Sequence, residues 1–159
     1  MTELRTAKEA LEGCAKKGLI LPLAEIDLDK ITTLAELAQG DQEAGEKLEK
    51  GLEPRSILWN NVFCAHYDSL HKLADAFLRF DAFTFTNHLC LFAYLCAHHP
   101  ELELDWSFFE KIRTKRNGIQ YYGQKASKED WLTIKPQIHV YITTLKNAIK
   151  QKIEKEVFV

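Results

Sequence analysis

Apolar and small residues recur at spacings of three and four after Pro54, and this spacing constrains the fold more than any other feature of the chain. The series comprises Leu58, Val62, Ala65, Ser69, Leu73, Ala76 and Phe80. Because an α-helix turns by about 100° per residue, these positions share one face. Pro54 suits a first helical turn, where its missing N–H group is not needed. The spacing therefore predicts a long core helix from Pro54 to about Phe80.

Helical spacing also covers most of the rest of the chain. Glycines and capping residues set the expected limits, which are 3–17, 27 or 29 to 40, 41–51, 84 or 86 to 99, 106–122 and 127–153. Ser127 and Asp130 have the spacing of a capping box, and Pro136 should kink the last helix. Residues 19–26 are expected to be extended or irregular, and the acidic segment 43–53 is the best candidate for a mobile connection. No alternating pattern is long enough to predict a sheet.

These elements predict an all-α fold, an antiparallel up-and-down bundle of four to five core helices with extra N-terminal helices. The chain has 159 residues, of which 46% are apolar, and this fits a single domain over 1–159. Within it we expect an acidic helical region at 1–53 and the core bundle at 54–153. The first residues lack an apolar signal region, and no apolar run approaches the roughly 18 residues that span a bilayer. We therefore expect a cytoplasmic protein without membrane contact.

Cysteines and histidines raise the question of disulfides and metals. The cysteines are Cys14, Cys64, Cys90 and Cys96. They form no close pairs, so we expect reduced thiols at apolar positions. His66 and His71 are five residues apart, which is off-register for two ligands on one helix. Structural packing is the prediction for the histidines, with no metal and no cofactor.

Cations and polar aromatic residues are concentrated between residues 111 and 123. On a helix that starts after Asp105 and ends at Gly123, polar side chains form one arc beside an apolar stripe. The arc contains Arg113, Arg116, Asn117, Gln120 and Tyr121. Residues 105–128 carry six cations against two acids, whereas the whole chain has a net charge of −2, which excludes a generally basic nucleic-acid coat. The arc is either a solvated helix face or a site for a local anion.

The order of residues in this segment resembles the signature helix of HEPN domains (higher eukaryotes and prokaryotes nucleotide-binding), which are small all-helical proteins. The similar stretches read Leu104-Asp105-Trp106-Ser107-Phe108-Phe109, Ile112-Arg113, Arg116-Asn117-Gly118-Ile119 and Tyr121-Tyr122-Gly123. Upstream, Thr86-Asn87-His88-Leu89 is similar to the helix start that precedes the signature in that family. The resemblance covers roughly residues 54–153.

Many HEPN proteins are metal-independent endoribonucleases, with a motif of an Arg, a polar residue and a His five positions after the Arg. Arg116 and Asn117 match the first two positions, but Tyr121 stands where the His is expected. A phenol with its usual pKa near 10 is protonated at neutral pH and is a poor general base. The resemblance thus implies Arg116, Asn117 and Tyr121 as the catalytic positions and His88 as a supporting residue. The side chains expected to bind ligand are Arg113, Lys115, Gln120 and Tyr122.

Two functions remain open from the sequence. The first is contact with RNA or a nucleotide through the Arg-Asn motif at a dimer cleft, with lost or weakened ribonuclease activity. The second is a catalytically silent module that binds a protein partner such as a minimal nucleotidyltransferase, as in toxin-antitoxin systems. A homodimer is expected in either case, because the apolar helix 89–97 and Phe109 on the polar arc leave more apolar surface than one bundle easily covers.

Overall fold

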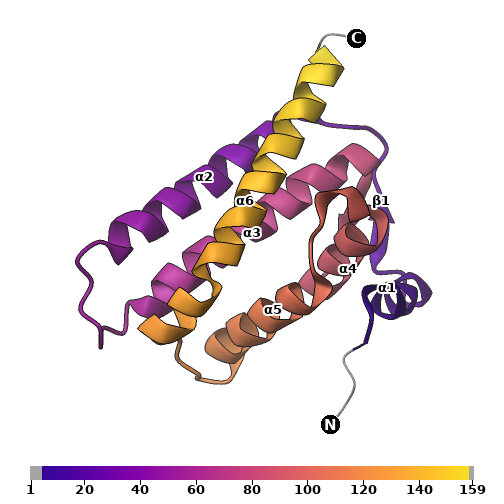
Figure 1. The fold of residues 1–159 in the computed structure, drawn as a ribbon. Coiled ribbons are helices and arrows are strands. Elements are labelled where there is room, and N and C mark those ends of the chain that lie inside the picture. The colour runs from indigo at the N-terminus through magenta and orange to yellow at the C-terminus, as the bar shows by residue number, and fades with distance from the viewer. Residues whose placement is uncertain (1–4, 158–159) are drawn as a thin grey trace.

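The computed structural model describes residues 5–157, which form six α-helices and one short two-stranded sheet, so the fold is all-α (Figure 1). The elements are α1 (Ala7–Lys16), β1 (Ile20–Pro22), α2 (Leu28–Glu49), α3 (Trp59–Leu78), β2 (Phe83–Phe85), α4 (His88–His98), α5 (Trp106–Tyr121) and α6 (Lys128–Val157). Short 3₁₀ turns follow α3 at Arg79–Asp81 and α4 at Pro100–Leu102. In this part of the chain no helix combines the length and the apolar character needed to cross a membrane.

Helix α3 lies at the centre of the fold and contacts α2, α4, α5 and α6 (Figure 1). More than half of its residues are buried, including the ring of Tyr67 and the leucines at 70 and 73. Because α3 is covered on several sides, its apolar positions extend beyond the single face that the sequence spacing marks. Helix α1 lies apart from α2 and packs on α4.

Several helix ends agree with the sequence prediction because the signals that set them are local. The carboxylate of Asp105 accepts a hydrogen bond from the amide of Ser107 at 3.0 Å and starts α5. Gly123 follows α5 with φ +66°, a left-handed conformation that favours glycine. Ser127 and Asp130 form the expected capping box, with distances of 3.0 and 2.9 Å.

Two helix starts differ from the prediction. Helix α3 begins at Trp59 instead of Pro54, and the Trp59 indole N–H donates to the carbonyl of Glu53 at 2.9 Å, which fixes the turns before the helix. Helix α4 is capped by Asn87 and not by Thr84 or Thr86. The Asn87 side chain accepts from the amide of Cys90 at 2.8 Å, while Thr84 is part of β2.

Helix α2 is continuous from Leu28 to Glu49, so the expected break at Gly40 is wrong, and the segment proposed as a mobile connection is helical as far as Glu49. Gly45 is buried where α2 meets α3. A Cβ atom at this position would lie 2.6 Å from Cε1 of His66. The glycine is therefore a packing requirement and not a helix end.

The sheet and a disulfide join the N-terminal region to α4. Strands β1 and β2 pair antiparallel over three residues, with Leu21 opposite Thr84, although the sequence predicts no sheet. Cys14 of α1 and Cys90 of α4 are buried and bonded to each other. The prediction of reduced thiols is therefore wrong for this pair. The two cysteines are 76 residues apart in the sequence, so their spacing gives no sign of the bond. Cys64 and Cys96 are free thiols.

The apolar surface that suggested a dimer is partly covered within the chain. Phe109 is 0% exposed, and its ring stacks on that of Phe92 with centroids 4.5 Å apart. The inference that Phe109 needs cover from a second subunit is therefore wrong, since α5 presents this side chain to α4.

Two glycines of α2 give a matched test of this packing. No atom lies within 4 Å of a Cβ placed at Gly40, so Gly40→Ala should stabilise the protein by about 0.5–1 kcal/mol through helix propensity. Gly45→Ala should destabilise it by about 1–3 kcal/mol, because the added methyl overlaps the His66 ring. Urea unfolding of both variants measures the difference. Equal effects would show that α2 does not pack this closely on α3.

Candidate anion-binding site

A polar pocket of about 420 Å³ lies where the start of α4 meets the middle and end of α5. It is lined by Thr86, Asn87, His88, Leu89, Arg113, Arg116, Asn117 and Tyr121. All three expected catalytic positions are in this set, together with Arg113 and His88. Residues 86–89 and the α5 motif are separated by more than 20 positions in the sequence, and the packing of α4 against α5 brings them together.

Helix geometry explains the composition of the pocket. Arg113, Arg116 and Asn117 lie at spacings of three and four on α5, so they project from one face. Across from them, α4 begins after its Asn87 cap, and the first turn of a helix carries partial positive charge. Two guanidinium groups and a helix N-terminus therefore surround the same polar space, an arrangement that favours an anion.

The two arginines differ in their partners. Arg113 donates to both carboxylate oxygens of Glu110, at 2.8 and 3.1 Å, so its charge is largely matched. Within residues 5–157 Arg116 forms no ion pair with a carboxylate. Its guanidinium lies 5.5 Å from the centre of the Tyr67 ring, and its buried Nε has no hydrogen-bond partner. Arg116 is thus held by an aromatic contact that leaves its donors free for an external anion.

An aromatic and imidazole cluster forms the wall behind Arg116. The Tyr67 hydroxyl and Nδ1 of His88 share a hydrogen bond of 2.8 Å, and the rings of His71 and His88 stack with centroids 3.8 Å apart. Burial lowers the pKa of His71 to about 3, with a further contribution from His88. Burial and the positive charges of Arg116 and Arg113 lower the pKa of His88 to about 4. Both imidazoles are therefore neutral at neutral pH.

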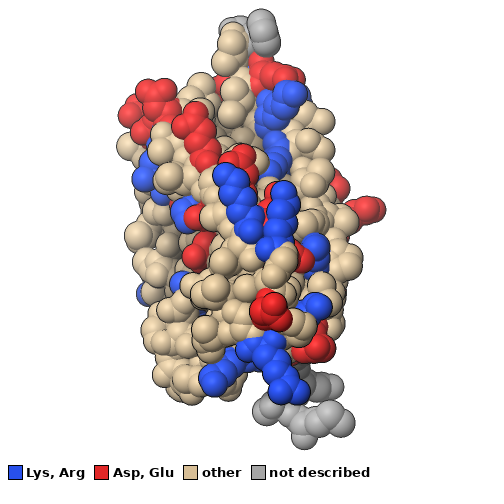
Figure 2. All heavy atoms as spheres, turned by 90° about the vertical axis from the view of Figure 1, so that its left-hand side faces the viewer, with Lys and Arg blue, Asp and Glu red and all other residues tan. Residues whose placement is uncertain are grey.

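Charged groups on one face of the molecule are mixed in sign. On the face that Figure 2 shows, lysines and arginines are interspersed with aspartates and glutamates, and no continuous basic surface covers it. This distribution suits a local anion contact better than a long track for a phosphate backbone.

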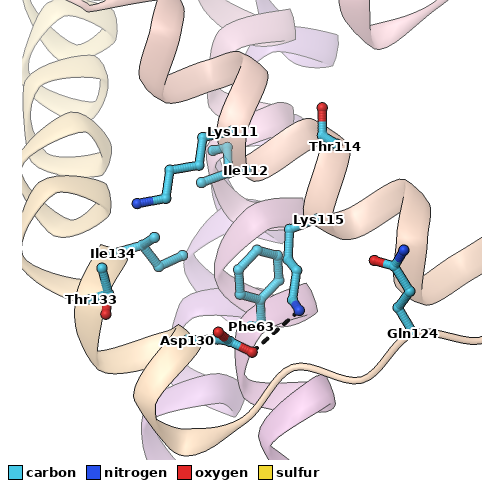
Figure 3. Close-up of a pocket in the computed structure, with 9 residues that line it drawn as sticks. All are labelled: Phe63, Lys111, Ile112, Thr114, Lys115, Gln124, Asp130, Thr133 and Ile134. Atoms are coloured by element: carbon cyan, nitrogen blue, oxygen red, sulfur yellow. Dashed lines mark ion pairs between the residues drawn. The ribbon is translucent and has the colours of Figure 1, made fainter. Parts of the chain in front are cut away.

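Three of the expected ligand-binding residues lie outside the pocket. Lys115 lines a different depression of about 350 Å³ between α5 and α6, where its ammonium group lies 3.2 Å from the carboxylate of Asp130 (Figure 3). It also donates to the carbonyl of Lys125. Gln120 and Tyr122 are exposed and do not line either space. Tyr121 is 71% exposed and lies at the rim, so its hydroxyl is open to solvent.

Sequence reasoning missed the residues that α3 contributes. Tyr67 and His71 occupy positions that fit an ordinary core helix, and only the packing of α3 against α4 and α5 shows that they orient His88 and Arg116. Asn87 belongs to the stretch of residues 86–89 that resembles a HEPN helix start, and its capping role follows from its position before an apolar run. No sequence signal connects these residues to Arg116.

Comparison with known proteins gives no match: no family model, curated protein or solved structure resembles the chain significantly.

The neutral histidines predict how stability depends on pH. In the unfolded chain a histidine has a pKa near 6.5, so below this pH the unfolded state binds protons that His71 and His88 do not bind in the folded state. The free energy of unfolding should therefore fall as the pH drops from about 6.5 towards 4. His71→Phe keeps an aromatic ring, removes one of these sites and should make the fall shallower. The matched change His98→Phe, at an exposed position, should leave it unchanged, and urea midpoints measured across this range test both.

Proposed function

We propose that this chain is a HEPN-like protein that contacts RNA or a nucleotide through phosphate binding at the Arg116 pocket. The observation that supports this most directly is the unpaired state of Arg116 among the described residues, beside a polar space that Asn117 and the start of α4 also line. An arginine of a solvated helix face has its donors bonded to water, whereas the Nε of Arg116 is buried and has no partner among the described residues.

Phosphate is the anion that the donors fit best. A guanidinium offers a planar fork of N–H groups that matches two phosphate oxygens, and a helix N-terminus adds amide donors and positive potential. Asn117 supplies a further donor from its carboxamide. The volume of about 420 Å³ is within the usual range for sites that hold small molecules, so a nucleotide unit fits better than a bare ion.

The chemistry of the pocket argues for binding with weak or absent cleavage. A ribonuclease of this type needs a base for the ribose 2′-hydroxyl, and Tyr121 is a phenol at an open rim. His88 lines the pocket, but burial, together with the charges of Arg116 and Arg113, lowers its pKa to about 4, which makes it a weak base. A bound phosphate would offset those positive charges and raise the pKa of His88, so any activity would depend on the ligand itself.

We further propose a homodimer with the two pockets at a shared cleft. The exposed rings of Tyr121 and Tyr122, which are 71% and 77% accessible, lie beside the pocket and offer a surface for a second subunit. The same rings suit the alternative function, a silent module that docks a protein partner such as a minimal nucleotidyltransferase. RNA binding distinguishes the two, because the silent module needs no free guanidinium.

Binding of a short labelled RNA at low salt tests the pocket. Wild-type protein should give salt-sensitive anisotropy changes, and Arg116→Ala should weaken the affinity by about tenfold or more, since it removes a charge-assisted contact. Lys111→Ala removes an exposed cation from the opposite side of α5 and is the matched control. Equal losses in the two variants would mean nonspecific attraction, and absence of binding by the wild type would favour the silent module.

Restoring the motif histidine tests the assignment of Tyr121. Wild-type protein should cleave RNA slowly or not at all without metal, and Tyr121→His should raise the rate and give 2′,3′-cyclic phosphate ends. Tyr122→His is the control, because this position lies outside the pocket. If both histidine variants remain inactive while Arg116 still governs binding, the site binds RNA but lacks the geometry for cleavage.

A further inference from the structure

We propose that the chain has a zinc site formed by Glu46 of α2, His66 of α3 and His139 of α6. One ligand atom from each of these residues, a carboxylate oxygen and a ring nitrogen from each histidine, lies within 4.8 Å of the others. The site is independent of the Arg116 pocket, because it shares no residue with it.

The hydrogen bonding of His66 leaves a nitrogen ready to bind a metal. Its Nδ1 lies 2.8 Å from the carbonyl oxygen of Val62, and a carbonyl can only accept, so Nδ1 carries the proton. The lone pair is therefore on Nε2. His66 is 0% exposed, and its Nε2 has no partner in the part of the chain that the structure describes. Metal-binding histidines usually donate their other ring N–H to a backbone carbonyl in this way.

His139, on α6, also has a ring nitrogen without a hydrogen-bond partner among the described residues. Its Nε2 is also buried without a partner, and the two imidazole rings stack with centroids 5.3 Å apart. A buried polar atom without a partner is costly, and a metal ion bound between the two histidines would give each Nε2 a partner.

The surrounding residues pack against the His66 ring, and the nearby lysines are bonded to partners other than Glu46. The indole of Trp131 packs on the His66 ring at a centroid distance of 4.2 Å, and Gly45 allows α2 to approach the same ring. The ammonium group of Lys135, which is on α6 like His139, lies 2.6 Å from the carboxylate of Glu49. Lys146 is bonded to the side-chain oxygens of Gln39 and Gln42. These partners leave Glu46 free to bind a cation.

Two imidazoles and one carboxylate favour zinc over magnesium or calcium, which prefer oxygen ligands. A tetrahedral zinc ion holds its ligand atoms roughly 3.3 Å apart, so the three groups, whose ligand atoms lie within 4.8 Å of one another, need to close by up to about 1.5 Å. The exposed Glu46 can make this movement on its flexible stem, and its exposure also gives the ion a path from solvent. The fourth position remains for water, and the ion would tie α2 to α3 and α6.

Zinc binding to the full-length, tag-free chain tests the proposal. After removal of metal with a chelator, titration calorimetry with zinc chloride should show one high-affinity site per chain, and zinc should raise the melting temperature. His139→Gln and Glu46→Gln should each weaken the affinity by about tenfold or more and reduce the rise in melting temperature. The matched controls His98→Gln and Glu43→Gln, at exposed positions outside the site, should bind as the wild type does.

A cobalt spectrum separates this site from the free thiols. Cobalt bound to Glu46, His66 and His139 gives no thiolate charge-transfer band, whereas binding at Cys64 or Cys96 gives one. The melting temperature without metal shows whether each variant is folded. The proposal is overturned if the wild type does not bind zinc, if the ligand and control variants bind equally, or if the cobalt spectrum shows thiolate ligation.

Discussion

The burial of α3 on several sides is the constraint on which the rest of the structure depends. Helix α3 contacts α2, α4, α5 and α6, and the residues that it buries include the polar side chains of His66 and Ser69. His66 and Tyr67 are neighbours in sequence and differ by about 100° around this helix. One therefore faces α2 and α6, while the other faces Arg116 on α5. A single core element thus supplies a member to each of the two proposed sites.

Sequence reasoning succeeded where the physical signal is local. The limits of α5 were predicted almost to the residue, because Asp105 caps it and Gly123 follows it in a left-handed conformation. The placement of Arg116 and Asn117 on one face of α5 follows for the same reason, since their spacing lies within one helix. Gly45 gave the opposite result. Glycine is unfavourable inside a helix, but the close approach of the His66 ring explains why this residue stands here. No pattern within α2 contains that information.

What the sequence could not provide is the relation between distant segments. The Cys14–Cys90 bond, the hydrogen bond between Tyr67 and His88, and the grouping of Glu46 with His139 all join residues far apart in the chain. Ligand spacing rules fail for such a group because they assume that two ligands share one helix or turn. His66 was judged by its distance from His71 on α3, although its partners come from α2 and α6.

Arg113 and Arg116 line the same pocket but differ in their charge partners. The two residues are three positions apart on the same face, but only Arg113 has a carboxylate one turn before it. The residue three positions before Arg116 is Arg113, which is itself a cation. Repulsion between the two arginines favours contact of Arg116 with the neutral Tyr67 ring instead of a local ion pair. The paired arginine still contributes to the potential that keeps His88 neutral. An anion entering this space therefore gains from the unpaired guanidinium and also relieves the repulsion between the two arginines, which makes binding and the protonation of His88 linked events.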